Sequence, residues 1–363
     1  YSKNQSPGMK REPSFAQNLH RWYRTNARDL PWRHTSDPYR IWISEIMLQQ
    51  TTVSAGIPYY QSWMKILPSV HHVARAPLQK ILKLWQGLGN YQRAKNIHRS
   101  ARIIRDLYKG NFPKTPGELK KLPGFGPYTT GAVLSIAFDI PYPLVDANVR
   151  RVMMRILAVE GYADPSQDQG VLNFLDQVMP KRNVRIFNQA LMELGALICR
   201  PQRPQCLLCP LHKMCRAYAA GIQEVIPKTK RKMIQDLEWV VGVIEKDGKY
   251  FIQKRPPQGL FASLWEFPGG KIEEGETGQE ALSREFREKL GIGMDSAQHM
   301  MNFQHFYTAF RAKLHVFLCQ PESCPTADTI HKWVSLKGLE KYPMPSGSAK
   351  IVDWLRNRTC AHN

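Results

Sequence analysis

Four cysteines in one short stretch of the chain have the spacing of a metal-binding loop. Cys199, Cys206, Cys209 and Cys215 follow the pattern C-x6-C-x2-C-x5-C. Thiols this close in sequence cannot form a disulfide framework spread over a fold, whereas four thiolates are a ligand set for zinc or for an iron–sulfur cluster. The spacing therefore predicts a metal centre, and the residue types alone leave zinc and iron–sulfur open.

A glycine-rich turn and a single acid precede the cysteines. The turn, Leu122-Pro-Gly-Phe-Gly-Pro-Tyr-Thr-Thr-Gly, joins predicted helices at 116–121 and 128–138. Gly124 and Gly126 allow positive φ and a close approach to a bulky ligand. The N–H groups at the start of the next helix can then hold a phosphate. Asp146 follows, and it is either a plain N-cap for helix 148–158 or an acid placed for chemistry.

A second carboxyl lies on an apolar helix near the start of the chain. Glu45 has Ile41 and Trp42 one turn before it and Leu48 one turn after it. These positions share one face of a helix, so Glu45 should be shielded from water. Burial raises the pKa of a carboxyl, and we therefore expect Glu45 to act as a general acid.

The remaining pattern supplies the elements that position these groups. Helical periodicity runs through 15–221, with predicted helices at 71–86, 92–108, 129–138, 148–158, 167–178 and 185–198. Strand-like runs at 239–245, 250–254 and 313–318 follow, with helices at 277–290 and 346–357. We predict a flexible tail (1–14), a mainly α domain (15–221), a basic linker (222–236) and an α+β domain (237–363).

The charge is concentrated in the first part of the chain. Of 51 Lys+Arg and 30 Asp+Glu, residues 1–236 hold 35 and 15, and the rest of the chain holds 16 and 15. An excess on one side favours nucleic acid as a partner over a solvated basic surface. The sequence contains no apolar run of 18 residues, so it predicts no membrane span. Residues 1–14 lack an apolar signal segment. We therefore expect an intracellular, reducing location.

The glycine-rich turn, Asp146 and the cysteine loop occur in the order of the helix-hairpin-helix DNA glycosylase superfamily, and the chain resembles that superfamily. The cysteine spacing is that of its endonuclease III branch, which implies a [4Fe–4S] cluster. Three features are similar to the adenine DNA glycosylase family: Glu45 in the segment 44–51, Tyr128 where bifunctional lyases have a lysine nucleophile, and a second domain. The implied fold is a mainly α helix-hairpin-helix glycosylase fold with an iron–sulfur loop, followed by an α+β Nudix-like domain.

The resemblance also implies a reaction. Adenine opposite 8-oxoguanine or guanine in double-stranded DNA would be flipped out of the helix. Glu45 would protonate it, while Asp146 would stabilise or attack the sugar cation and water would complete the hydrolysis. Tyr128 and Asn148 would position these groups. The enzyme would be monofunctional and monomeric, would act in the bacterial cytoplasm and nucleoid, and could have other repair proteins as partners. The residues implied to contact DNA are Gln50, Thr51, Asn90, Tyr91, Gly124, Gly126, Tyr307 and Thr308.

Three lesion-reading positions depart from the family. The family has two tyrosines after Gly-Leu-Gly, the first of them wedged into DNA, but here Asn90 precedes Tyr91. The family's Phe-Ser-His turn is replaced by Tyr307-Thr308-Ala309, which keeps a ring and a hydroxyl and loses an imidazole. These departures predict a weaker preference for 8-oxoguanine over guanine.

Residues 270–292 are similar to a Nudix box, the Mg²⁺-binding motif of pyrophosphohydrolases. Glu285 and Glu288 match its acids, but Lys289 stands where a further glutamate is expected. An ammonium among metal ligands opposes a dication, so we predict a binding domain derived from a hydrolase. Three alternatives stay open: a thymine or uracil mismatch glycosylase, a pyrophosphohydrolase fused to a DNA-binding module, and a non-catalytic DNA-binding protein.

Overall fold

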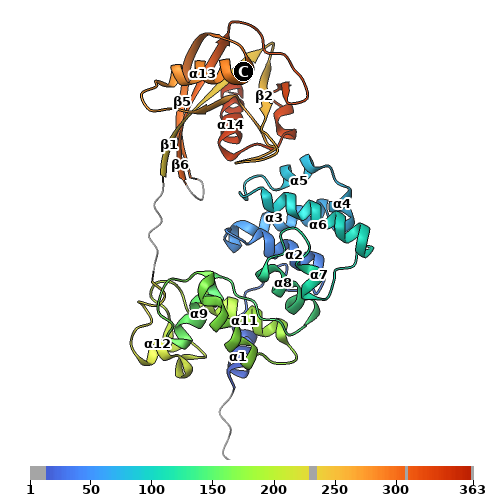
Figure 1. Cartoon of the computed structure of the whole chain (residues 1–363), viewed down its shortest axis with the longest axis vertical. Helices are drawn as coiled ribbons and strands as arrows, with labels where there is room; N and C mark the ends of the chain where they lie inside the picture. Colours follow the sequence, from blue (N-terminus) through green and yellow to red (C-terminus); the bar gives the residue numbers. More distant parts are fainter. Residues whose placement is uncertain (1–13, 229–234, 307–309, 361–363) are drawn as a thin grey trace, which may run out of the picture. The chain divides into compact units, whose positions relative to one another are not determined.

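The chain folds into two compact units, and the computed structural model describes residues 14–228, 235–306 and 310–360 (Figure 1). One unit comprises Tyr1–Ala74 and Arg99–Arg231, and the other Arg75–His98 and Lys232–Asn363. The division near residue 231 falls inside the predicted linker. Nothing in the sequence pattern indicated that 75–98 belongs with the C-terminal part, and the finer domain boundaries stay a prediction.

The first unit is helical, as its periodicity predicts. Its helices, together with α5 and the start of α6 from the second unit, are α1 (Phe15–Asn26), α2 (Pro38–Met47), α3 (Val53–Ile66), α4 (Val70–Arg75), α5 (Leu78–Leu84), α6 (Gln92–Tyr108), α7 (Pro116–Leu119), α8 (Pro127–Ala132), α9 (Ala147–Leu157), α10 (Asp168–Val178), α11 (Val184–Leu197) and α12 (Arg216–Ala219).

Two packing regions hold the site-bearing helices. Leu19, Met153 and Leu191 are fully buried in a core shared by α1, α9, α10 and α11. On α2, the buried ring of Trp42 stacks on Phe125 with 5.4 Å between centroids. Because Phe125 lies in the glycine-rich turn between α7 and α8, this contact fixes the turn against the helix that carries Glu45.

Two predicted helices differ in the structure. The helix predicted at 71–86 is broken, because α4 ends at Arg75 and α5 begins at Leu78. Pro77 lies between them, where it lacks an N–H and restrains the residue before it. The helix predicted at 129–138 starts as α8 and continues as a π-helical stretch, η1 (Val133–Ala137).

The C-terminal part of the second unit is a sheet with one helix against each face (Figure 1). Alternate residues of β1 face opposite ways, so Val240 packs with α13 residues such as Phe286 and Val241 packs with α14 residues such as Ile351. The strand order is β3-β2-β1-β6-β5, with β1 and β6 parallel. The elements are β1 (Gln235–Lys246), β2 (Lys249–Lys254), β3 (Trp265–Glu266), β4 (Gly269–Lys271), α13 (Gly278–Leu290), β5 (Met294–Phe306), β6 (Phe310–Pro321), β7 (His331–Ser335) and α14 (Ser346–Cys360).

The sequence did not predict β5. This long strand pairs antiparallel with β6 at the end of the strand order, and most of its side chains are exposed or half-buried. A strand on a sheet edge need not alternate apolar and polar residues strictly, so its periodicity is weak.

Candidate active site

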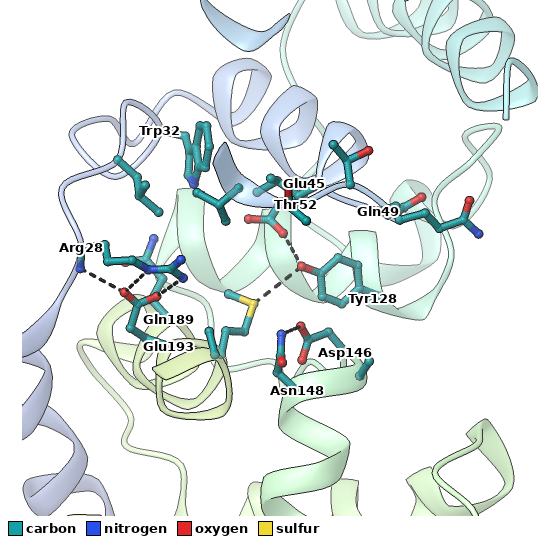
Figure 2. A pocket seen from close by; sticks show the side chains of 18 of the residues that line it. Arg28, Trp32, Glu45, Gln49, Thr52, Tyr128, Asp146, Asn148, Gln189 and Glu193 are labelled. Carbon is teal, nitrogen blue, oxygen red and sulfur yellow. Dashed lines mark hydrogen bonds and ion pairs between the residues drawn. The ribbon is translucent and has the colours of Figure 1, made fainter. Parts of the chain in front are cut away.

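A pocket of about 950 Å³ in the helical unit contains both predicted carboxyls (Figure 2). Glu45 enters it from α2, Tyr128 from α8, and Asp146 and Asn148 from the start of α9. Figure 2 shows Tyr128 between the two carboxyls, and its hydroxyl donates a hydrogen bond to Oε2 of Glu45. A pocket of this size is within the range that encloses small ligands. The structure thus brings all four predicted catalytic residues into one pocket.

Glu45 is a buried acid. It is 6% exposed, and Ile41 and Trp42 on the same helix are each 1% exposed, which confirms the apolar face expected from the sequence. Burial raises the pKa of Glu45 to about 7, and the hydrogen bond from Tyr128 offsets part of that rise. A carboxyl with a pKa near 7 is protonated in a large share of molecules at neutral pH and can release its proton, as a general acid must.

Asp146 is both an N-cap and part of the pocket. Its Oδ1 accepts the main-chain N–H of Val149 at 2.6 Å, and its Oδ2 accepts Nδ2 of Asn148 at 3.1 Å. Burial raises the pKa of Asp146, and these hydrogen bonds oppose the rise. The two readings of this acid left open by the sequence are therefore compatible, because the capping bonds favour the ionised carboxylate and fix its orientation.

A third carboxyl in the pocket was missed by sequence reasoning. Glu193 of α11, with 1% of its side chain exposed, pairs with Arg28 at 2.8 Å and with Arg33 at 2.5 Å. Burial alone would raise the pKa of Glu193, but hydrogen bonds from both arginines outweigh it and lower the pKa to about 2. The one sequence signal was a glutamate inside the apolar run 190–197, and nothing there pointed to its partners.

The glycine-rich turn is the hairpin that the sequence predicts, but only one of its two glycines needs special backbone freedom. Gly124 has φ of 84°, in the left-handed region. Gly126 has φ of −75° and precedes α8 as its N-cap, so it does not use the positive φ that a glycine allows. A Cβ on Gly126 would meet no protein atom within 4 Å, which leaves open space beside the N-terminus of α8.

The other predicted DNA contacts lie in different surroundings. Gln50 and Thr51 line the pocket just after α2, and Gln50 is exposed with φ of 66°. Asn90 is exposed with φ of 39°, whereas Tyr91 is 5% exposed and its hydroxyl donates to the carbonyl of Met344 at 3.2 Å within the second unit. Of these two, only Asn90 is presented to solvent. Tyr307, Thr308 and Ala309 lie outside the described residues.

All four cysteines of the loop line one small pocket beside α9. Each of the four side chains is half-buried. Within the described part of the chain, no three His, Cys, Asp or Glu side chains are placed to hold a single metal ion. Four thiols around one pocket are a donor set that fits a thiolate-ligated metal centre.

A buried arginine holds the cysteine loop to the helix that begins after Asp146. Arg155 is 2% exposed and donates to Sγ of Cys199 at 3.3 Å. It also donates to the main-chain carbonyls of Arg200, Pro201 and Ile226 at 2.7, 3.0 and 2.7 Å. A guanidinium with this many main-chain acceptors fixes the path of the loop.

Comparisons with known proteins agree with this fold and site. Residues 43–172 match the family model for the HhH-GPD superfamily base excision DNA repair protein, and residues 240–354 match the model for the NUDIX domain. A solved thermostable thymine-DNA glycosylase matches with a TM-score of 0.51 and 31% identity, and it covers 57% of this chain and 95% of its own. The fold and the pocket therefore define a helix-hairpin-helix DNA glycosylase with a Nudix-like C-terminal domain, as predicted.

Relatives that span the whole chain are more specific. An adenine DNA glycosylase from Buchnera aphidicola subsp. Acyrthosiphon pisum is 34% identical over 93% of this chain and 97% of its own length. One from Mus musculus is 32% identical over 89% of this chain and 74% of its own. The chain belongs to the adenine DNA glycosylase family, an enzyme family of base excision repair. In the described structure, no helix is long and apolar enough to cross a membrane.

Proposed function

We propose that the enzyme removes adenine mispaired with 8-oxoguanine or guanine and does so without cutting the DNA strand. The observation that carries this proposal is the pair of carboxyls in one pocket, buried Glu45 and half-buried Asp146, with Tyr128 between them (Figure 2). The described residues that line this pocket include no lysine, so it offers no amine for the Schiff base of a bifunctional lyase.

The chemistry follows from the different surroundings of the two carboxyls. Glu45, with a pKa of about 7, protonates the flipped adenine and makes it a better leaving group. Asp146, oriented by Asn148 and by the N–H of Val149, stabilises the oxocarbenium sugar or attacks it, and water completes the hydrolysis. Tyr128 holds the Glu45 carboxyl in place through its hydroxyl.

Duplex DNA would be held by the basic helical part of the chain. The open space beside Gly126 lets a phosphate approach the N–H groups that begin α8, while positive φ at Gly124 forms the turn. Gln50 and Thr51 at the edge of the pocket and exposed Asn90 would contact the strand around the lesion. Tyr91, Tyr307 and Thr308 stay candidates on the grounds of family resemblance alone.

We infer that the cysteine loop holds a [4Fe–4S] cluster, with one thiolate each from Cys199, Cys206, Cys209 and Cys215. The shared pocket supports a single centre ligated by all four thiolates, and the cysteine spacing of the endonuclease III branch favours iron–sulfur over zinc. The cluster supplies a structural cross-link that keeps the basic segment 200–216 in shape for DNA. We also infer that the enzyme works as a monomer on the bacterial chromosome, alongside other repair proteins.

One experiment tests the substrate directly. Single-turnover base release is measured on duplexes that carry A, T or U opposite 8-oxoguanine or G. Release of adenine, with no strand cleavage until alkali is added, is the expected result. Faster release of T or U than of A would favour the mismatch-glycosylase alternative. The assay includes T and U because a solved thymine-DNA glycosylase shares the helical fold.

The same assay measures lesion preference. Because Asn90, Thr308 and Ala309 replace family side chains, the ratio of adenine release opposite 8-oxoguanine to release opposite G should be smaller than is usual in the family. The substitution Asn90→Tyr should raise this ratio, because an aromatic ring can stack where the amide cannot. A native ratio equal to the family's would contradict the prediction.

A further inference from the structure

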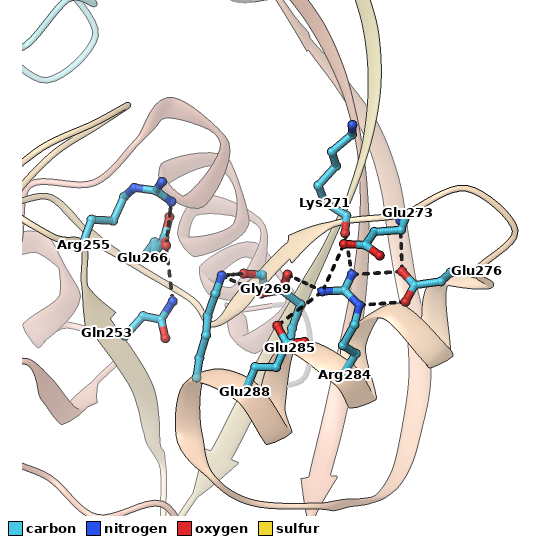
Figure 3. A network of polar contacts seen from close by, with 11 residues as sticks. Gln253, Arg255, Glu266, Gly269, Lys271, Glu273, Glu276, Arg284, Glu285 and Glu288 are labelled. Atoms are coloured by element: carbon cyan, nitrogen blue, oxygen red, sulfur yellow. Dashed lines mark hydrogen bonds and ion pairs between the residues drawn. The ribbon is translucent and has the colours of Figure 1, made fainter.

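The Nudix box of the C-terminal domain brings four glutamates around one arginine (Figure 3). Arg284 of α13 donates to both carboxylate oxygens of Glu276 at 2.7 and 2.9 Å and to Oε1 of Glu285 at 3.1 Å. It also lies 4.0 Å from Glu273 and 3.6 Å from Glu288. Arg284 therefore accounts for only one oxygen of Glu285.

Glu285 is the most deeply buried of these acids. It is 7% exposed, and its carboxylate is packed so tightly against β4 that a Cβ on Gly270 would lie 1.9 Å from Oε1. A carboxylate taken out of water in this way is strongly destabilising unless a cation faces its second oxygen. In a metal-dependent hydrolase that cation would be a divalent metal held by hard oxygen ligands.

Lys289 provides this cation from one helical turn further along α13. Its Nζ lies 2.5 Å from Oε2 of Glu285 and donates to the main-chain carbonyl of Gly269 at 2.7 Å. A carboxylate oxygen and a backbone carbonyl are also two ligands that Mg²⁺ or Mn²⁺ would take. The ammonium thus lies where those oxygens would otherwise direct a metal ion.

We propose that Lys289 is a built-in substitute for a divalent cation, so that the Nudix-like domain keeps its acid cluster intact without a metal. A metal ion could enter only by displacing the ammonium from two close contacts, and it would then face a positive charge tethered to the same helix. The domain consequently lacks the metal that pyrophosphate hydrolysis requires, and its cluster serves as a scaffold for binding. Replacing Lys289 by an acid should uncover the metal site.

The test is Mn²⁺ binding by the full-length protein with its cluster, followed by the EPR signal of free Mn²⁺. Wild-type protein should show no saturable binding, whereas Lys289→Glu should bind one Mn²⁺ with a Kd on the order of 10⁻⁴–10⁻³ M, the range of weak cation sites. Arg287→Glu, an exposed charge change of the same size on the same helix, is the matched control and should not bind. Adding Glu285→Gln to Lys289→Glu should abolish binding.

Three results would overturn the proposal: saturable Mn²⁺ binding by wild type that Glu285→Gln removes, no binding by a folded Lys289→Glu protein, or equal binding by the Arg287→Glu control. If Lys289→Glu does not fold, Lys289→Met replaces it. That protein should melt at a lower temperature than wild type and regain part of the loss in Mn²⁺. Unchanged melting, or a loss that Mn²⁺ leaves unaltered, would also overturn the proposal.

Discussion

Glu45 in the helical unit and Glu285 in the C-terminal domain are buried to nearly the same extent, with 6% and 7% of each residue exposed. Their partners differ. The hydrogen bond to Glu45 comes from the neutral hydroxyl of Tyr128, whereas Glu285 is held between the cations of Arg284 and Lys289. Burial alone therefore does not decide what a carboxyl does.

The partner decides the role of the acid. A buried carboxyl beside a neutral donor has a raised pKa, so it can carry a proton near neutral pH and give it to a substrate. A buried carboxylate between two cations is held in ion pairs, which fix the packing around it. The difference does not depend on which domain an acid lies in. Glu193 lies in the same pocket as Glu45, yet it is paired with two arginines and has a pKa of about 2.

The largest expected effect is on catalysis, when a carboxyl of the active-site pocket is replaced by an amide. Glu45→Gln removes the proton donor, and Asp146→Asn removes the charge that faces the sugar cation. Each should slow single-turnover adenine release on the order of 10²–10⁴-fold, because acid catalysis and charge stabilisation contribute on this scale. Binding to the uncleaved duplex, measured by fluorescence anisotropy, should be nearly unchanged. Full activity in either variant would remove that carboxyl from the mechanism.

Glu193→Gln should destabilise the helical unit by about 3 kcal/mol, because it leaves two arginines around a buried position without their anion. The pKa of Glu193 is lowered in the fold, so its stabilising effect is present above the unfolded pKa of 4.5 and is lost only as pH falls towards 2. Melting temperatures at pH 5 and pH 8 should therefore fall by similar amounts. A fall seen at one pH only would contradict the pairing.

Glu45→Gln should have the opposite effect on stability: it should raise the melting temperature at pH 8. The pKa of Glu45 rises from 4.5 to about 7 on folding, so its favourable protonated state is lost as pH rises through 7. At pH 8 the native protein must hold a buried charge at a cost of about 3 kcal/mol, which glutamine removes. The variant should melt several degrees above wild type at pH 8, and this gain should fade towards pH 4.5. Adenine release by the native enzyme should decline above pH 7 for the same reason.

The smallest expected effect lies at the start of α13. Thr277 and Glu280 form a capping box, in which Oγ1 of Thr277 accepts the N–H of Glu280 at 3.3 Å and Oε2 of Glu280 accepts the N–H of Thr277 at 2.7 Å. Thr277→Ala should cost about 1 kcal/mol of stability, while Thr277→Ser should cost less. Adenine release opposite G should not change, because the helix serves as scaffold. A large loss of activity would show that this domain takes part in the chemistry.

Much of the site could be predicted from local sequence. Three local patterns each indicate the chemical surroundings of a side chain from neighbours within a few helical turns. They are the spacing of the four cysteines, the apolar positions around Glu45, and Lys289 among the acids of the Nudix box. Helical periodicity placed the helices that carry Asp146 and Glu193 to within a few residues. Helical periodicity missed the break between α4 and α5 at Pro77. The period-2 pattern missed β5, because an exposed edge strand need not alternate apolar and polar residues.

What the sequence by itself determined is which residues are capable of chemistry and which helices carry them. Only the tertiary structure decided their charge states. Tyr128 and Glu45 are 83 positions apart, and Arg28 and Glu193 are 165 apart, yet each pair is in hydrogen-bond contact. A pKa depends on burial and on the nearest charge, and both are set by packing between distant helices. Tyr91 shows the same point, because its burial against Met344 could not be read from its place beside Asn90.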